Sequence, residues 1–309
     1  MSFSLPGKRV WVAGHRGMAG AAILGRLADE GCELLTVDHK ELDLRRQADV
    51  EDWMGKAKPD VVVVAAGTVG GILANSTRPA EFIHDNLTIG SNIIHGAHLC
   101  GVKKLLFLGA TCLYPRLAEM PVAEEALLTG PIEPTNEAYA IAKIAGIKLC
   151  QSYRQQYGCD FISAMPTSLI GPGDKFDLAF GHVAASLIMK MQAAKLAGAK
   201  NVEIWGTGAP KRELLYVGDF AEACVFLLKN YSDPMPINIG SGQEISIRQL
   251  AEMIARIVGF TGSLAFDASK PDGAPRRILD SSRLAALGWQ AQTPLEQGLR
   301  EAYAWFLAR

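Results

Sequence analysis

Tyr139 and Lys143 lie four positions apart in TNEAYAIAKIAGIKL, a stretch with the capping signal and apolar spacing of an amphipathic helix. Residues at i and i+4 share one face of a helix, so the phenol and the ammonium group are expected to be neighbours. The pKa of an ordinary tyrosine is near ~10, and a neighbouring lysine charge lowers it. Although many helices carry this spacing by chance, the pair is typical of a proton donor and acceptor.

Three glycines follow the first apolar run in GHRGMAG, namely Gly14, Gly17 and Gly20. Glycine permits a tight turn and a close approach of backbone, and the next helix then presents free N–H groups to a pyrophosphate. Because the motif stands between an expected strand and an expected helix, it predicts a dinucleotide site rather than a simple turn.

Asp38 lies 24 positions after Gly14, at the end of the second apolar run. An acid at this place hydrogen-bonds the adenosine ribose and disfavours the 2′-phosphate of NADP. Arg16, His39 and Lys40 favour that phosphate, and a solvated turn residue is a further interpretation of Asp38. The residues therefore predict a nicotinamide dinucleotide and leave the choice between NAD and NADP open.

The stretch LFLGATCLYP ends the apolar run KKLLFLG at the surface and brings Ala110, Thr111 and Cys112 to the edge of the expected sheet. A free cysteine is most often a small buried apolar residue, and a lone histidine such as His182 is most often structural. Residue type alone therefore assigns no function to Cys112 or to His182.

The pair Tyr139 and Lys143, together with GHRGMAG, resembles the extended short-chain dehydrogenase/reductase superfamily. Longer strings over nearly the whole chain closely resemble the GDP-L-fucose synthase family: VGGILANSTRPAEFIHDN, SNIIHGAHLCGVKKLLFLG, CLYP, EPTNEAYAIAKIAGIKLC, GTGAPKRELLYV and DASKPDGAPRRILD.

This resemblance implies two reactions in one site on a GDP-linked 4-keto-6-deoxy sugar, with GDP-L-fucose as the expected product. Cys112 and His182 match the residues that move protons at C3 and C5 of the sugar. Tyr139 matches the proton donor for reduction at C4, and Lys143 tunes it. The implied cofactor is NADP(H), while Asp38 leaves NAD(H) open.

Further site residues are predicted on each side of the expected cleft. Cofactor-binding positions are Gly14, Arg16, Gly17, Met18, Gly20, Asp38, His39, Ala66, Lys143, Pro166 and His182. Substrate-binding positions implied by the resemblance are Lys190, Trp205, Arg212, Lys270 and Asp272.

The chain departs from the family at Ala110, where the family has a serine that hydrogen-bonds the 4-oxygen of the sugar. Losing such a donor typically costs on the order of 10²–10³ in rate. Three explanations stay open: Thr111 supplies a hydroxyl, the sequence is an engineered serine-to-alanine variant that mainly binds, or the sugar is held differently. Alternation along a strand would aim Thr111 elsewhere unless the backbone turns.

Further departures cluster in the expected substrate part, at Ser168, Lys175, Leu178 and Gly218. They leave open a different GDP-4-keto-deoxy sugar or a GDP-heptose as the substrate of a related reductase or epimerase. A catalytically silent binding protein is a third alternative, and retention of Cys112 and Tyr139 argues against it.

The alternation of β-branched runs with helix-period stretches predicts an α/β fold, a doubly wound parallel (Rossmann) sheet with a smaller C-terminal α/β substrate domain. We expect the dinucleotide-binding domain to cover 1–167 plus about 219–240, and the nucleotide-sugar domain to cover 168–218 plus about 241–309. The segments 171–182 and 206–219 are expected to be loops, and PINIG is expected to return to the parallel sheet.

The chain has a formal net charge of −1, which argues against a nucleic-acid or membrane partner. Six scattered cysteines without a CxxC pair predict reduced thiols, a cytoplasmic location without a signal peptide, and no metal site. By analogy with the superfamily, the expected helices at 79–100 and 136–157 form the seam of a homodimer.

Overall fold

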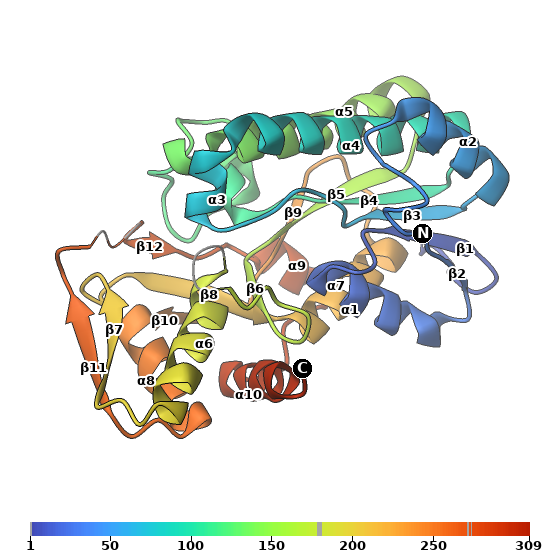
Figure 1. The fold of residues 1–309 in the computed structure, drawn as a ribbon. Coiled ribbons are helices and arrows are strands. Elements are labelled where there is room, and N and C mark those ends of the chain that lie inside the picture. Colours follow the sequence, from blue (N-terminus) through green and yellow to red (C-terminus); the bar gives the residue numbers. More distant parts are fainter. Residues whose placement is uncertain (1, 178–180, 271, 273) are drawn as a thin grey trace.

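A six-stranded parallel sheet lies between two layers of helices (Figure 1). The structure, a computed structural model, describes residues 2–177, 181–270, 272 and 274–309. The sheet has the order β2-β1-β3-β4-β5-β9. Its strands are β1 (Arg9–Ala13), β2 (Glu33–Leu35), β3 (Val61–Val64), β4 (Lys104–Leu108), β5 (Phe161–Pro166) and β9 (Ile237–Ile239). The order reverses between β1 and β3, and the carboxyl ends of strands at such a point are where α/β sheets bind ligands.

The two layers of helices cover opposite faces of the sheet. Alternate residues of β1 divide between them, because Val10 and Val12 belong to one apolar core and Trp11 and Ala13 to the other. The first face is covered by α1 (Met18–Leu27) and α7 (Val217–Asn230), and the second by α2 (Gln47–Ala57), α4 (Pro79–Leu99) and α5 (Glu137–Tyr157). The predicted doubly wound α/β fold is confirmed, and we call this set of elements the parallel-sheet part.

The remaining elements form a second set, the small-sheet part. Its larger sheet has the order β10-β8-β12, with β6 also paired to β8, and its smaller sheet pairs β7 with β11. A third apolar core, which includes Met191, Ile254 and Leu299, joins these sheets to helices α6, α8 and α10. The elements are β6 (Ser168–Ile170), α6 (Val183–Leu196), β7 (Asn201–Trp205), β8 (Lys211–Tyr216), β10 (Glu244–Ser246), α8 (Ile247–Val258), β11 (Ser263–Asp267), β12 (Arg276–Arg277) and α10 (Leu295–Leu307).

Short elements complete the chain, and two of them border the expected site. The 3₁₀ turn η2 (Thr111–Leu113) follows β4, and α3 (Ile72–Thr77) follows β3. The others are η1 (Ala28–Glu30), η3 (Glu124–Ala126), η4 (Pro134–Asn136) and α9 (Ser282–Ala286).

The sequence located the five strands of the first half and the helices between them, and PINIG is confirmed as β9 of the parallel sheet. The prediction that 206–219 is a loop is wrong, because β8 and the start of α7 lie inside it. Charged residues at the start of KRELLY concealed this strand, although Glu213 is 1% exposed and is satisfied by backbone N–H groups of Gly242 and Leu279.

The proposed division into two domains at about 168, 219 and 240 stays a prediction. In the structure β9 and α7 lie with the parallel-sheet part, and β10 begins the return to the small-sheet part. Among the described residues no helix is both long and apolar enough to cross a bilayer. Leu178, one of the family departures, lies outside the described residues.

Candidate active site

The glycine turn after β1 is built by close backbone contacts. Gly14 has a φ of +87°, and a Cβ at this position would stand 2.6 Å from the backbone nitrogen of Ala66, just after β3. A Cβ on Gly20 would overlap the carbonyl oxygen of Gly14. Gly17 precedes α1 without a side-chain cap, so the first N–H groups of that helix are open to an anion. This geometry fits the pyrophosphate of a dinucleotide.

Asp38 follows β2 and pairs with the glycine turn. Its Oδ2 accepts a hydrogen bond of 2.6 Å from Nη2 of Arg16, and its Oδ1 lies 3.4 Å from Nε2 of His15. His39 and Lys40, the next two residues, are exposed. The structure therefore brings the predicted acid and one predicted phosphate-binding cation into a single contact.

Tyr139 and Lys143 lie in the first two turns of α5, where η2 packs against the helix. Burial raises the pKa of Tyr139, and the nearby Cys112 adds to the rise. Burial lowers the pKa of Lys143 to about 8, and its Nζ lies 4.3 Å from the centroid of the Phe107 ring. The pKa of Tyr139 thus lies above its usual value, and the prediction that a lysine charge lowers it is wrong for this structure, because burial is the largest influence on the phenol.

Cys112 lies in η2 and acts electrostatically on both Tyr139 and Lys143. Burial raises the pKa of its thiol to about 11, while the positive charges of Arg277 and Lys143 oppose that rise. The structure therefore brings three of the predicted catalytic residues together at the end of β4.

The backbone turns immediately after Ala110. Ala110 is extended, with φ −165° and ψ 157°, and the 3₁₀ turn starts at Thr111, so the alternation of the strand stops there. Among the described residues the buried Oγ1 of Thr111 has no hydrogen-bond partner. Leaving a buried hydroxyl unpaired costs about 1–3 kcal/mol, so this atom is suited to receive a ligand or water.

His182 is the residue before α6, where its side chain makes no capping hydrogen bond and instead faces Asp174 on the loop after β6. Its Nδ1 lies 3.4 Å from Oδ1 of Asp174, which is 5% exposed, and this contact raises the pKa of His182. The same loop passes against the start of α1, because a Cβ on Gly173 would stand 3.2 Å from Cα of Met18. Sequence analysis missed Asp174, whose signal was an acid in the Gly/Pro-rich stretch GPGD.

The predicted substrate residues lie in the small-sheet part. Trp205 is 60% exposed at the end of β7, and Nζ of Lys190 and Nζ of Lys270 lie 5.6 Å and 5.7 Å from its ring centroid. Asp272 accepts hydrogen bonds from N and Oγ1 of Thr207. An exposed aromatic ring with two cations near it is suited to a base that carries phosphates.

Two arginines lie side by side on paired strands of the small-sheet part. Arg212 of β8 and Arg277 of β12 are paired in register, and burial lowers the pKa of both. Nη1 of Arg212 donates to the carbonyl of Ala274 at 2.6 Å, and Nη1 of Arg277 donates to that of Pro115 at 3.2 Å. Arg277 was missed by sequence analysis, although PRR stands in one of the quoted strings.

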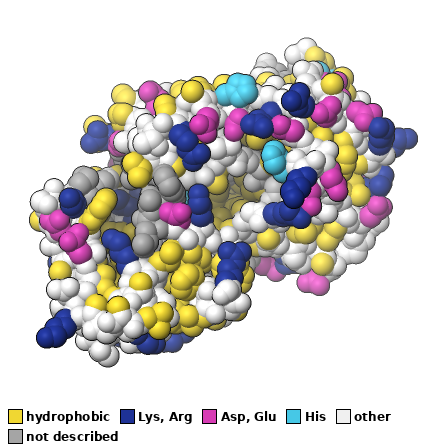
Figure 2. All heavy atoms as spheres, viewed as in Figure 1, with side chains coloured by type: hydrophobic (Ala, Val, Ile, Leu, Met, Phe, Trp, Pro, Cys, Tyr) yellow, Lys and Arg dark blue, Asp and Glu magenta, His cyan; other side chains and the backbone are white. Residues whose placement is uncertain are grey.

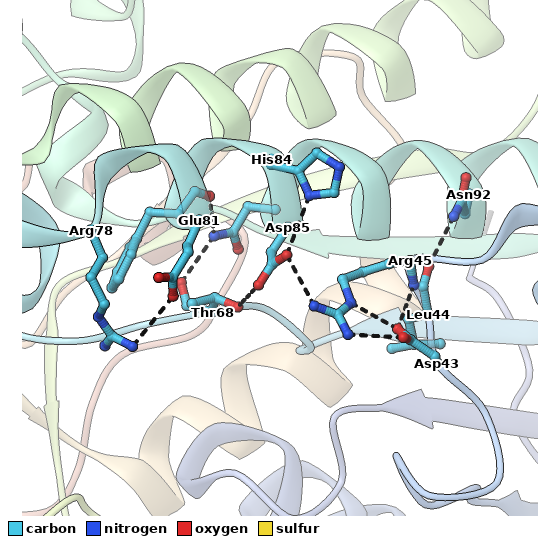
Figure 3. A network of polar contacts seen from close by, with 11 residues as sticks. Asp43, Leu44, Arg45, Thr68, Arg78, Glu81, His84, Asp85 and Asn92 are labelled. Carbon is cyan, nitrogen blue, oxygen red and sulfur yellow. Dashed lines mark hydrogen bonds and ion pairs between the residues drawn. The ribbon is translucent and has the colours of Figure 1, made fainter.

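A polar network on α4 holds the segment after β2 against the segment after β3 (Figure 3). Asp85 accepts from Oγ1 of Thr68 at 2.8 Å and lies 3.4 Å from Nη1 of Arg45, which also pairs with Asp43. Asn92 donates from Nδ2 to the carbonyl of Leu44 at 2.9 Å. Because Ala66 lies in the same segment as Thr68, this network supports the backbone that the glycine turn touches.

Other predicted cofactor positions stand at strand ends. Ala66 lies two residues after β3, and Pro166 is the last residue of β5. Figure 2 shows a hollow between the two parts of the molecule, with apolar side chains inside it and Lys and Arg side chains near its rim. The fold thus directs the ends of β1, β3, β4 and β5 toward one side of the sheet.

The sequence model of the NAD dependent epimerase/dehydratase family matches residues 10–240. The chain belongs to this family, which is the class that the sheet and the glycine turn define. Within it, the chain belongs with the GDP-L-fucose synthases, as its motifs predicted.

Individual relatives are similar over nearly their whole length. GDP-L-fucose synthase of Sinorhizobium fredii is 56% identical over 306 residues, covering 99% of this chain and 98% of the relative. A solved structure of a GDP-L-fucose synthetase from Naegleria fowleri bound to NADP has a TM-score of 0.90 and 30% identity, covering 100% of this chain and 96% of that one. A GDP-6-OMe-4-keto-L-xylo-heptose reductase from C. jejuni has a TM-score of 0.91 and 32% identity, covering 98% of both chains.

Proposed function

We propose that this protein is an NADP(H)-dependent epimerase and reductase that converts a GDP-linked 4-keto-6-deoxy sugar to GDP-L-fucose. The observation that carries the proposal is the grouping of Cys112 with Tyr139 and Lys143 at the end of β4. The 56% identity to a GDP-L-fucose synthase supports this sugar over a heptose, since the heptose reductase is 32% identical.

The epimerase half-reaction needs one group that removes a proton and one that returns a proton to the opposite face of the sugar. The 4-keto group acidifies the protons at C3 and C5, since their removal gives an enolate. We assign the two transfers to Cys112 and His182. A thiol with an imidazole and a thiolate with an imidazolium differ only in the place of one proton, so either form supplies one acid and one base.

The reductase half-reaction needs a proton for the 4-oxygen. A nicotinamide cofactor held at the glycine turn would supply the hydride for C4. Tyr139 is held protonated and donates its proton to the oxygen as negative charge develops there. The neighbouring charge of Lys143 stabilises the phenolate that remains, which is the role of a tuning cation.

Thr111 takes the place of the family serine in this proposal. Its buried hydroxyl has no hydrogen-bond partner in the described part of the chain, and the turn at Ala110 removes the strand alternation that would aim it elsewhere. The impairment by Ala110 stays a prediction.

The GDP moiety is assigned to the small-sheet part. Arg212 suits the diphosphate, because a planar guanidinium matches phosphate oxygens. The base is assigned to Trp205 and the cations beside it, with Lys190, Lys270 and Asp272 lining that region.

The oligomeric state and the cellular location belong to the same proposal. We infer a homodimer through the outer face of α4 and α5, by superfamily analogy. We also infer a cytoplasmic protein, since six scattered cysteines suit a reducing compartment and are free in the structure.

The test is incubation of purified protein with GDP-4-keto-6-deoxymannose and NADPH, or with NADH, in D₂O. The expected product is GDP-L-fucose carrying deuterium at C3 and C5, detected by NMR and mass spectrometry. Reduction without deuterium at these carbons would show a simple 4-reductase, and absence of product with both cofactors would overturn the assignment.

A further inference from the structure

Arg16 and Asp38 form an ion pair at the outer edge of the glycine turn. Nη2 of Arg16 lies 2.6 Å from Oδ2 of Asp38, and Nε2 of His15 lies 3.4 Å from Oδ1 of the same carboxylate. The side chain of Arg16 is 72% exposed and that of Asp38 is 31% exposed. Asp38 is thus held from two sides, whereas Arg16 extends from the turn into solvent.

The end of β2 beside β1 is the place where the fold receives the adenosine ribose of a dinucleotide. A carboxylate there accepts hydrogen bonds from the 2′-hydroxyl of NAD and repels the 2′-phosphate of NADP, whereas an arginine attracts that phosphate. This chain has both groups, and they are already bonded to each other.

We propose that Asp38 is a specificity-determining residue that competes with the 2′-phosphate of the cofactor for Arg16, so that NADPH, the cofactor of the proposed function, binds only slightly more tightly than NADH. The inference rests on the proposed function only in taking this site as a dinucleotide site. When the 2′-phosphorylated cofactor binds, Arg16 exchanges its contact with a carboxylate for a contact with a phosphate. The net gain in binding free energy from the phosphate is therefore small. Asp38 keeps its contact from His15 in that exchange.

The exchange also explains why the pair suits both ligands. With a 2′-hydroxyl, Asp38 accepts its hydrogen bond while remaining paired to Arg16, since a carboxylate has lone pairs for several donors. With a 2′-phosphate, the exposed Arg16 turns away from Asp38 without leaving a buried charge unpaired.

The test measures binding of two adenosine fragments to the full chain by calorimetry at low salt. The fragments are adenosine 2′,5′-bisphosphate, which carries the distinguishing phosphate, and AMP, which lacks it. For the unmodified protein we expect dissociation constants within about tenfold of each other, because the phosphate gains one charge-assisted contact and loses another.

Asp38→Asn frees Arg16 and is expected to tighten the bisphosphate by roughly tenfold while AMP binds no tighter. Arg16→Gln is expected to weaken the bisphosphate selectively, and more strongly in the Asp38→Asn background than alone, since the two residues share a contact. Glu41→Gln is the matched control, because Glu41 is an exposed acid three residues further along the same segment and makes no ion pair with Arg16 in the described structure.

Two results would overturn the inference: a bisphosphate preference above about a hundredfold in the unmodified protein, or an Asp38→Asn preference equal to that of Glu41→Gln. If neither fragment binds, the dinucleotide site itself is wrong, and the proposed function fails with it. If both bind with an unchanged ratio in all variants, only the role of Asp38 fails. Thermal unfolding of each variant checks that the fold is retained.

Discussion

The glycine turn and the Cys112 edge stand at the carboxyl ends of β1 and β4, with β3 between them, and they depend on different kinds of contact. At the turn, backbone touches backbone, as the distance of 2.6 Å from a Cβ on Gly14 to the nitrogen of Ala66 demonstrates. At the Cys112 edge, the working groups are buried or half-buried side chains, namely an amine, a thiol and a guanidinium whose pKa values are shifted by burial. The first region is specified by the absence of side chains, and the second by their electrostatic influence on one another.

This difference teaches which substitutions each region tolerates. A backbone contact fails when any atom is added, whatever its chemistry. A buried charge tolerates changes of shape but depends on each neighbour, since low polarity magnifies every charge nearby. The predictions below test whether the two regions fail in these different ways, beginning with the largest effect.

Tyr139→Phe removes the proton donor at the Cys112 edge and leaves the glycine turn intact. We expect reduction to fall on the order of 10³-fold, within the range of general acid catalysis. Deuterium incorporation at C3 and C5 of the keto sugar should persist, and cofactor binding should change little. Rate measurements in D₂O separate the two half-reactions, and equal loss of both would contradict separate roles for Tyr139 and Cys112.

Gly14→Ala adds one carbon atom at the glycine turn. We expect the free energy of unfolding to fall by about 3 kcal/mol or more, because φ +87° is strained for alanine and the new Cβ meets immovable backbone. Chemical denaturation measures the loss. Gly17→Ala is the matched control, since its Cβ would find only an ordinary contact of 3.5 Å with the Gly14 oxygen; equal effects would refute the contrast.

Thr111→Val removes the unpaired hydroxyl and keeps the side-chain volume. We expect reduction at C4 to slow on the order of 10²-fold, as for loss of a preorganised donor. Steady-state kinetics measures the change, and Thr111→Ser should retain most of the rate.

Ala110→Ser provides the complementary experiment for the same donor. If Thr111 already supplies the hydroxyl, restoring serine should raise the rate by no more than about threefold. A gain of a hundredfold would instead identify Ala110 as the cause of a handicapped site.

Asp174→Asn is expected to change the pH dependence of the epimerase half-reaction more than its maximal rate. Asp174 raises the pKa of His182, so its carboxylate favours the protonated ring. Removing that charge should shift the His182 limb of the pH profile for deuterium incorporation to lower pH, with less than about a tenfold change in the maximal rate. The pH dependence of the reduction step should not change. A shift of the His182 limb to higher pH would show that Asp174 does not stabilise the protonated ring of His182.

The sequence located the parallel sheet because apolar runs such as VVVV need both faces covered, a constraint that is local in the chain. It also placed Tyr139 beside Lys143, since helix geometry brings i and i+4 together. Arg277 and Asp174 were missed because their partners Pro115 and His182 are set by loop paths and strand pairing, which no spacing reveals. The unpaired hydroxyl of Thr111 likewise depends on a backbone turn that the strand pattern did not predict.

The chain passes between the two parts of the molecule more than once. It leaves the parallel sheet after β5, returns through α7 and β9, and leaves again before β10. The residues assigned to the sugar nucleotide are therefore encoded in two separated stretches of the gene. Recombination at a single crossover cannot replace that surface as one cassette, so relatives with new sugars are expected to arise by scattered point substitutions, such as those at Ser168 and Gly218.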